Sequence, residues 1–232
     1  MSQAILFAFL LYIAAATASN SVEQDILWAL PVISHGVNVY AEVFYDSTLQ
    51  SEGSSGKVVT KDKLESSIHD IFKLAEQVFH NYSLMIHFQV QIRDQMTDAV
   101  RVMRDDKKAL KPNETLEEFK KHIPREPLRK DSIFYLLTKT PLIGKEREEE
   151  KVDDEFRSYG TFGSFCTGST SAVVVHLHPE EDYINVAKAT ANTFGLNEYP
   201  TTPEADFFKL LFAFEYCRQN TCSAQCLQQC GA

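Results

Sequence analysis

Segments with the pattern of β-strands alternate along this chain with segments patterned like amphipathic helices. The most constraining is the run from Ser132 to Thr138, SIFYLLT, which is short and apolar almost throughout. Such a run is typical of a central strand that is buried on both faces of a sheet. Alternation of strands and helices around it predicts a three-layer α/β domain with a mostly parallel sheet.

The other segments complete this alternation. Period-two patterns and β-branched residues predict strands at Val37–Asp46, Leu84–Ile92 and Ala172–His178. Apolar residues at helical spacing predict helices at residues 61–82, 113–123, 183–194 and 206–217. The charged residues 144–158 predict an exposed loop or frayed helix, and the glycine-rich residues 160–171 predict irregular structure.

The amino-terminal residues 1–18 predict a signal peptide. Ala4 to Ala16 form an apolar run that is short for a membrane span, and Ala16-Thr17-Ala18 fits a small-x-small cleavage site. Two N-x-[ST] sequons, at Asn81 and Asn113, predict glycosylation of an exported protein. We therefore expect a secreted, extracellular chain with a lead at 19–36, a single domain at 37–232 and no membrane span.

The net charge and the cysteines indicate which kinds of partner this chain can have. The formal net charge of −9 argues against a nucleic-acid partner, because phosphate binding needs basic surface. In an exported protein the cysteines are expected to form disulfides. Their number is odd, so one thiol is free or links a second molecule as a dimer. They are Cys166, Cys217, Cys222, Cys226 and Cys230, and the pairing within the tail stays open.

The predicted helix at 183–194 carries one apolar packing face and ends at Gly195, where a left-handed residue stops a helix at low steric cost. Lys188 and Asn192 lie four residues apart and share another face. This spacing matches the zinc helix H-E-x-x-H-x-x-G-x-x-H, in which three histidines bind one ion and the glutamate activates water. With the motif's glycine at Gly195, its other positions fall on Lys188, Ala189, Asn192 and Glu198.

From Val37 to its C-terminus the chain resembles the reprolysin-type (adamalysin-type) metalloproteases, the metzincins of snake venom and tick saliva. The resemblance rests on the order of several segments, which are YAEVFYDS, LESSIHDIFKLAEQVFH, IHFQVQI, TLEEFKKHI, DSIFYLLT, the loop from Gly163 to Cys166, SAVVV and ATANTFGLNEY. It implies a metzincin-like fold with a mixed, mostly parallel sheet and a shortened C-terminal subdomain. It also implies a disulfide between Cys166 and Cys217.

The chain departs from the family pattern at the positions that bind zinc and catalyse hydrolysis. Lys188 and Asn192 cannot replace imidazole ligands, Glu198 alone cannot hold zinc, and Ala189 leaves no general base. No methionine follows the helix, although the family has a methionine turn beneath its metal. We therefore expect no zinc cofactor and no catalytic residues. The expected function is binding of an extracellular protein or peptide by a scaffold that has lost its activity, for example along a sheet edge.

Two alternatives stay open. In the first, a relocated zinc site in an active peptidase uses His176, His178 and Glu198, since His176 and His178 would share one face of a strand. The bland interpretation of that pair is a strand end that emerges into solvent. In the second, the chain is a structural or disulfide-linked secreted glycoprotein. The remaining histidines suggest no site, because His69 and His80 are too far apart for one ion and His35, His87 and His122 are isolated in sequence.

Overall fold

The computed structural model describes residues 33–52, 57–82, 84–96, 100–104, 108–123, 129–146, 153–177 and 182–197, together with Leu210, Phe214 and Cys217. Several predictions fall outside the described residues. They concern the signal peptide, the shortened C-terminal subdomain, His178, Glu198, Cys222, Cys226 and Cys230. Among the described helices, none combines the length and apolar character that a membrane span requires.

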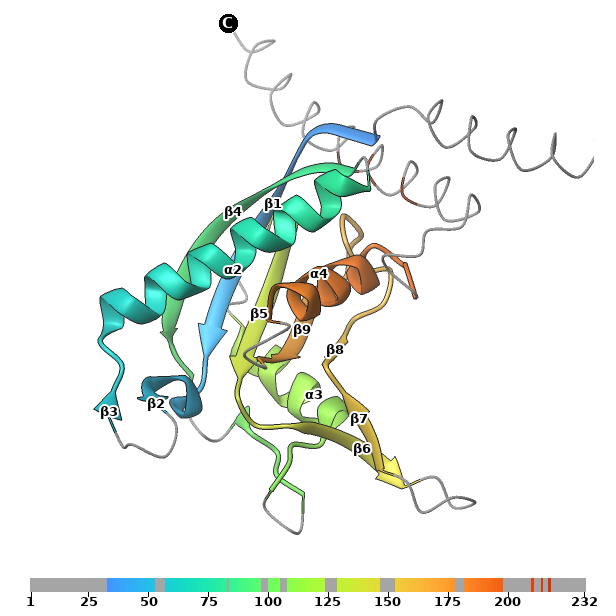
Figure 1. The fold of residues 1–232 in the computed structure, drawn as a ribbon. Helices are drawn as coiled ribbons and strands as arrows, with labels where there is room; N and C mark the ends of the chain where they lie inside the picture. The colour runs from blue at the N-terminus through green and yellow to red at the C-terminus, as the bar shows by residue number, and fades with distance from the viewer. Residues whose placement is uncertain are drawn as a thin grey trace, which may run out of the picture. The chain divides into compact units, whose positions relative to one another are not determined.

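A five-stranded sheet forms the centre of the described fold, with the strand order β4-β1-β5-β9-β8. Four strands are parallel, and the edge strand β8 runs antiparallel to its neighbour β9 (Figure 1). The sheet is therefore mixed and mostly parallel, which confirms the predicted α/β class. The strands are β1 (Ile33–Tyr45), β4 (Leu84–Gln95), β5 (Ser132–Thr138), β8 (Ser158–Gly160) and β9 (Ser171–His176).

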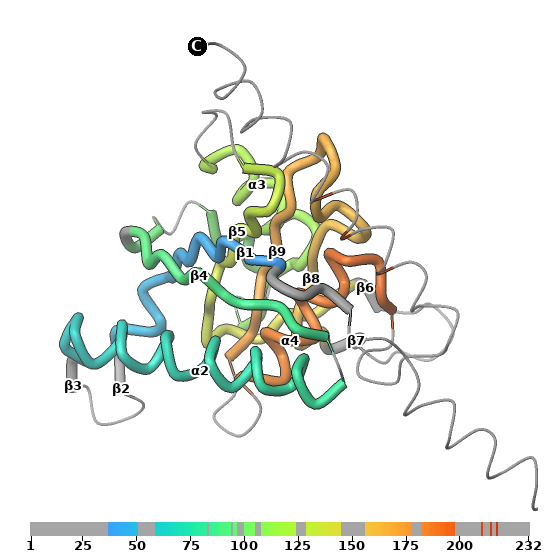
Figure 2. The backbone as a smooth tube through the Cα atoms, turned by 90° about the horizontal axis from the view of Figure 1, so that it is seen from above, coloured from blue at the N-terminus to red at the C-terminus, as the bar shows by residue number. Residues whose placement is uncertain are grey.

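Helices cover both faces of this sheet and make three layers. Helices α2 (Lys61–Asn81) and α4 (Asp182–Thr193) lie on one face, and α3 (Pro112–His122) lies on the other (Figure 2). In α2 the buried side chains recur three or four residues apart, as its sequence predicts. They are Leu64, Ile68, Phe72, Ala75 and Phe79.

The two cores explain why the Ser132–Thr138 run is apolar throughout. Successive side chains of a strand point to opposite faces of the sheet. Tyr135 packs toward α2, where its ring lies 4.9 Å from that of Phe72. Its neighbour Phe134 belongs to the second core, together with Phe119 of α3. Every residue of β5 is buried as a result, which confirms the prediction of a central strand.

Short strands appear where the sequence predicted irregular structure. Part of the charged run forms β7 (Asp153–Phe156), which pairs antiparallel with β6 (Leu142–Glu146), so the prediction of a loop or frayed helix is wrong there. Pairing of Leu142 with Phe156 explains the difference, because both side chains pack on the α3 core and anchor a hairpin there. The short segments η1 (Ser47–Gln50), β2 (Ser51–Glu52) and β3 (Lys57–Val58) lie between β1 and α2. Strand β1 itself begins before the predicted Val37.

A buried carboxylate joins the ends of β1 and β5. Asp46 is only 1% exposed and accepts a hydrogen bond of 2.6 Å from the Thr138 hydroxyl. Arg101 Nε lies 3.0 Å from the same carboxylate, and Thr48 donates to it through both its N–H and its hydroxyl. Because a buried charge is stable only when it is paired and hydrogen-bonded, this network holds the carboxyl ends of the two strands together.

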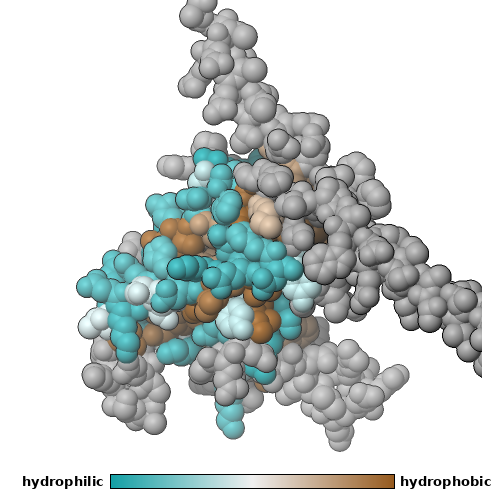
Figure 3. All heavy atoms as spheres, turned by 45° about the horizontal axis from the view of Figure 1, so that its top comes forward, coloured by the Kyte–Doolittle hydropathy of each residue, from teal (hydrophilic) through white to brown (hydrophobic). Residues whose placement is uncertain are grey.

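The described surface is mostly hydrophilic in the view of Figure 3, with smaller apolar areas between the polar residues. Asn81, at the end of α2, and Asn113, in the first turn of α3, are both exposed. Both positions therefore meet the steric requirement of the predicted glycosylation.

Candidate functional site

Helix α4 packs on the sheet through the face that its sequence predicted. Val186, Ala187 and Ala191 are buried, and Phe194 directly after the helix is 3% exposed. Lys188 is exposed on the opposite side. The apolar spacing thus identified correctly which side of α4 faces the core.

The end of α4 is set by Gly195, which has a φ of +91°. Its N–H donates to the Asn192 carbonyl at 3.0 Å, and the N–H of Leu196 donates to the Ala191 carbonyl at 3.0 Å. This pair of bonds is a Schellman motif, in which the residue after the helix takes the left-handed conformation. Glycine adopts that conformation without strain, as the sequence suggested for this position.

The glycine-rich loop before β9 binds to the end of α4 through its backbone. The N–H of Gly163 donates to the Asn192 carbonyl at 3.1 Å, and the N–H of Phe165 donates to the Thr193 carbonyl at 3.0 Å. These bonds satisfy carbonyls that the last turn of a helix leaves without intrahelical partners. The loop therefore fixes where α4 ends.

A disulfide and an aromatic cluster hold the same region. Cys166 of the loop is bonded to Cys217, with a Cα–Cα distance of 5.2 Å, as the family resemblance implied. The Phe194 ring lies 4.8 Å from that of Phe165 and 5.1 Å from that of Phe214. The loop is thus joined to Cys217 covalently and to Phe194 and Phe214 by aromatic packing.

Tyr135 of β5 connects the central strand to α4. Its hydroxyl lies 2.8 Å from Thr190 Oγ1, which itself donates to the Val186 carbonyl at 2.8 Å. Because the Thr190 proton is engaged in that second bond, the tyrosine must be the donor in the first. Complete burial raises the pKa of Tyr135, so it keeps the proton that this bond needs.

Among the described residues, the positions that match the zinc motif carry no zinc ligand. Lys188 carries a cation, the half-buried Asn192 offers only an amide, and Ala189 is 2% exposed within the core. Zinc in proteins is held by imidazole, thiolate and carboxylate groups, and none of these is present at the three positions. Glu198, the fourth of these positions, lies outside the described residues.

His176 is buried. The bland interpretation of the histidine pair, a strand end that emerges into solvent, is therefore wrong for this residue. His176 is 5% exposed and pairs with Thr138 of β5 in the ladder, because β9 runs between two other strands. Its carbonyl accepts a hydrogen bond of 3.2 Å from the fully buried Asn185 side chain of α4. Strand β9 ends at this residue, and the predicted partner His178 lies outside the described residues.

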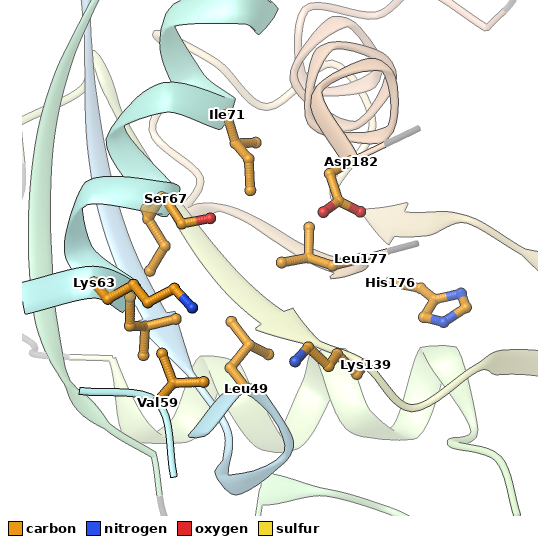
Figure 4. A pocket seen from close by; sticks show the side chains of 11 residues that line it. Leu49, Val59, Lys63, Ser67, Ile71, Lys139, His176, Leu177 and Asp182 are labelled. Carbon is orange, nitrogen blue, oxygen red and sulfur yellow. The ribbon is translucent and has the colours of Figure 1, made fainter. Parts of the chain in front are cut away.

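A pocket of about 400 Å³ opens at the carboxyl ends of β5 and β9. Leu49, Ile71 and Leu177 contribute apolar lining, while the ammonium groups of Lys63 and Lys139 point toward each other across Leu49 (Figure 4). Ligands of open α/β sheets commonly bind at this edge. The pocket is on the face of the sheet that α2 and α4 cover.

The structure also brings together three side chains whose association the sequence analysis missed. Glu76 and His80 of α2 meet His87 of β4, with one donor atom of each within 4.8 Å of the other two. The positions of His80 and His87 in the chain do not reveal this contact, because they do not show how β4 lies along α2. The i,i+4 spacing of Glu76 and His80 near the end of a helix is the sequence signal that indicates a possible metal site there.

No family model matches this sequence, and no curated protein sequence is similar to it. Among solved structures, the chain is similar to metalloproteinase-II from Bacteroides fragilis, with 9% identity, a TM-score of 0.46 and coverage of 76% of this chain. It spans about half of that protein, 53% of its length. It is also similar to archaemetzincin from Methanopyrus kandleri, with 12% identity, a TM-score of 0.40 and coverage of 82% of this chain and 98% of the other. Neither alignment assigns a role to any residue of this chain.

Substitution Gly195→Ala tests whether the turn after α4 depends on a left-handed residue. We expect it to lower the free energy of unfolding by roughly 1–2 kcal/mol, because a Cβ disfavours this conformation. Gly168→Ala is the matched control, since Gly168 lies in the loop before β9, has no positive φ and would place a Cβ that meets no atom within 4 Å beyond its two chain neighbours. Chemical denaturation measures both, and equal stability of the two variants would contradict the assignment.

Proposed function

We propose that this chain is a secreted, catalytically inactive homologue of the reprolysin-type metalloproteases that acts by binding an extracellular protein or peptide. The observation that carries the proposal is the contrast within α4. The helix has the buried face and the glycine turn of a zinc helix, whereas Lys188, Ala189 and Asn192 occupy the chemical positions. The residues that serve folding are present, and those that would serve catalysis are not.

Inactivity follows from the chemistry that is missing. A zinc peptidase needs a metal to polarise the carbonyl and to activate water, and it needs a base to accept the proton. Lys188 would repel a cation from the position of the first ligand. Ala189 supplies no carboxylate, and its buried surroundings would penalise one.

The edge strand β8 supports peptide binding as the mode of action. Within the described sheet β8 pairs only with β9, through Arg157 O at 2.9 Å from His176 N and Thr161 N at 3.0 Å from Ala172 O. Backbone groups alternate in direction along an antiparallel strand, so those of Ser158 and Gly160 point to the other side. An extended peptide could add to this edge as a further strand.

Restoring the ligands tests the relation of α4 to a zinc helix. We expect the triple variant Lys188→His, Asn192→His, Glu198→His to bind one more zinc ion per chain than the wild type, because the helix and its turn would bring three imidazoles together. Ala189 is kept, since a glutamate there would be buried. Metal analysis after dialysis measures the difference, and Lys188→His alone is the control that should add none.

An unchanged zinc content in a folded triple variant would contradict the assignment of α4. Chelator-sensitive hydrolysis of an unfolded protein by the wild-type chain would contradict inactivity. That second result would favour the relocated zinc site with His176 and His178.

Substitution Ser158→Pro tests binding at the β8 edge. Proline removes the N–H that points away from β9 and is tolerated on an edge strand. We expect peptides selected from a random library on the wild-type protein to bind this variant about tenfold more weakly or worse, as loss of a backbone hydrogen bond predicts. Ser158→Ala keeps the N–H and should bind normally. Equal affinity of the proline variant, measured by fluorescence anisotropy, would show that the peptides bind elsewhere.

A further inference from the structure

A cluster of three side chains that can bind metal lies at strand β4, the edge of the sheet opposite to β8. Glu76 and His80 are four residues apart on α2 and therefore adjacent on its surface. His87 comes from the edge strand β4. Glu76 Oε1 lies 3.3 Å from His87 Nδ1 and 4.0 Å from His80 Nε2, so one carboxylate oxygen faces both imidazoles.

The backbone of β4 orients this carboxylate. The N–H of Phe88 donates to Glu76 Oε2 at 2.9 Å, which turns Oε1 toward the two rings. Outer contacts of this kind fix the direction of a metal ligand before the ion arrives. His80 Nε2 lies 2.8 Å from the Ile86 carbonyl, so without metal it carries the proton and donates it to that oxygen.

The donor set suits a divalent transition metal ion. Two imidazoles and one carboxylate are a known zinc combination, with a fourth position left for water. Bond lengths of about 2.0–2.2 Å place neighbouring donors in a tetrahedral site roughly 3.3 Å apart. The Glu76–His87 pair already has this separation, and His80 Nε2 needs to approach Oε1 from 4.0 Å.

The position of the cluster gives an ion access. The side chain of His87 is 50% exposed, whereas those of His80 and Glu76 are 30% and 25% exposed. The carboxylate supplies the negative charge that a cation needs, and partial burial limits competition from water. Binding through His80 Nε2 would require the neutral ring to carry its proton on Nδ1 and would break the bond to Ile86.

We propose that Glu76, His80 and His87 form a binding site for a divalent transition metal ion, with Zn²⁺ as the fitting probe. The site is separate from the positions on α4 and does not depend on the proposed function. A bound ion would link the C-terminal part of α2 to the edge strand β4. The simpler alternative is that Glu76 and His80 only satisfy backbone groups of β4, with no affinity for metal.

Calorimetric titration of the full chain with Zn²⁺, under non-reducing conditions, tests the proposal. We expect saturable binding that weakens at least tenfold in His87→Ala and in His80→Gln, since each loses one of three ligands. The glutamine in His80→Gln can still donate to Ile86, so it separates loss of the ligand from loss of that bond. His69→Ala is the matched control, because His69 is exposed on the same helix outside the cluster.

Thermal unfolding provides the second readout. Zinc should raise the Tm of the wild type and of His69→Ala, because a ligand of the folded state stabilises it, and should leave the two cluster variants unchanged. Absence of zinc binding by the wild type would overturn the proposal. Unchanged affinity in folded His87→Ala would also overturn it, because it would place the ion at other residues.

Discussion

The glycine-rich loop that binds to the end of α4 is the contact on which the arrangement of this region depends. Gly163 and Phe165 donate their N–H groups to the last carbonyls of the helix, and Gly195 turns the chain with a positive φ. The same loop places Cys166 beside Cys217 and Phe165 beside Phe194. A helix end held by backbone bonds, a disulfide and aromatic packing keeps its geometry whatever side chains its exposed face carries.

This contact constrains the exposed residues of α4 less than its buried residues. Lys188 is exposed and Asn192 is half-buried, so substitution at these positions costs little stability. Val186, Ala191 and Gly195 are constrained by packing or by backbone conformation. Packing and backbone conformation thus constrain Val186, Ala191 and Gly195 more than Lys188 and Asn192, whereas the buried Ala189 belongs to the core itself.

Sequence reasoning was most successful where burial determines the pattern. The bounds of β5 agree with the prediction, and α2 differs by one residue at its end, because both bury apolar side chains at a regular spacing. It missed β7, whose charged residues resemble a loop, and β8, which is three residues long. It also missed that Glu76, His80 and His87 meet, since the register of β4 against α2 is a property of the tertiary structure. Burial of His176 was missed for a related reason, because only the strand order shows that β9 has neighbours on both sides.

We expect metal binding at one of two places on this chain and not at the other. Lys188 and Asn192 of α4 occupy ligand positions of the zinc motif and are not zinc ligands, whereas Glu76, His80 and His87 are possible ligands that belong to no motif in the sequence. Anomalous diffraction at the zinc absorption edge, from wild-type crystals soaked in zinc, locates the ion directly. We expect a peak between Glu76, His80 and His87 and none beside Lys188 and Asn192. A peak beside Lys188 and Asn192 would contradict the proposal that α4 holds no zinc site.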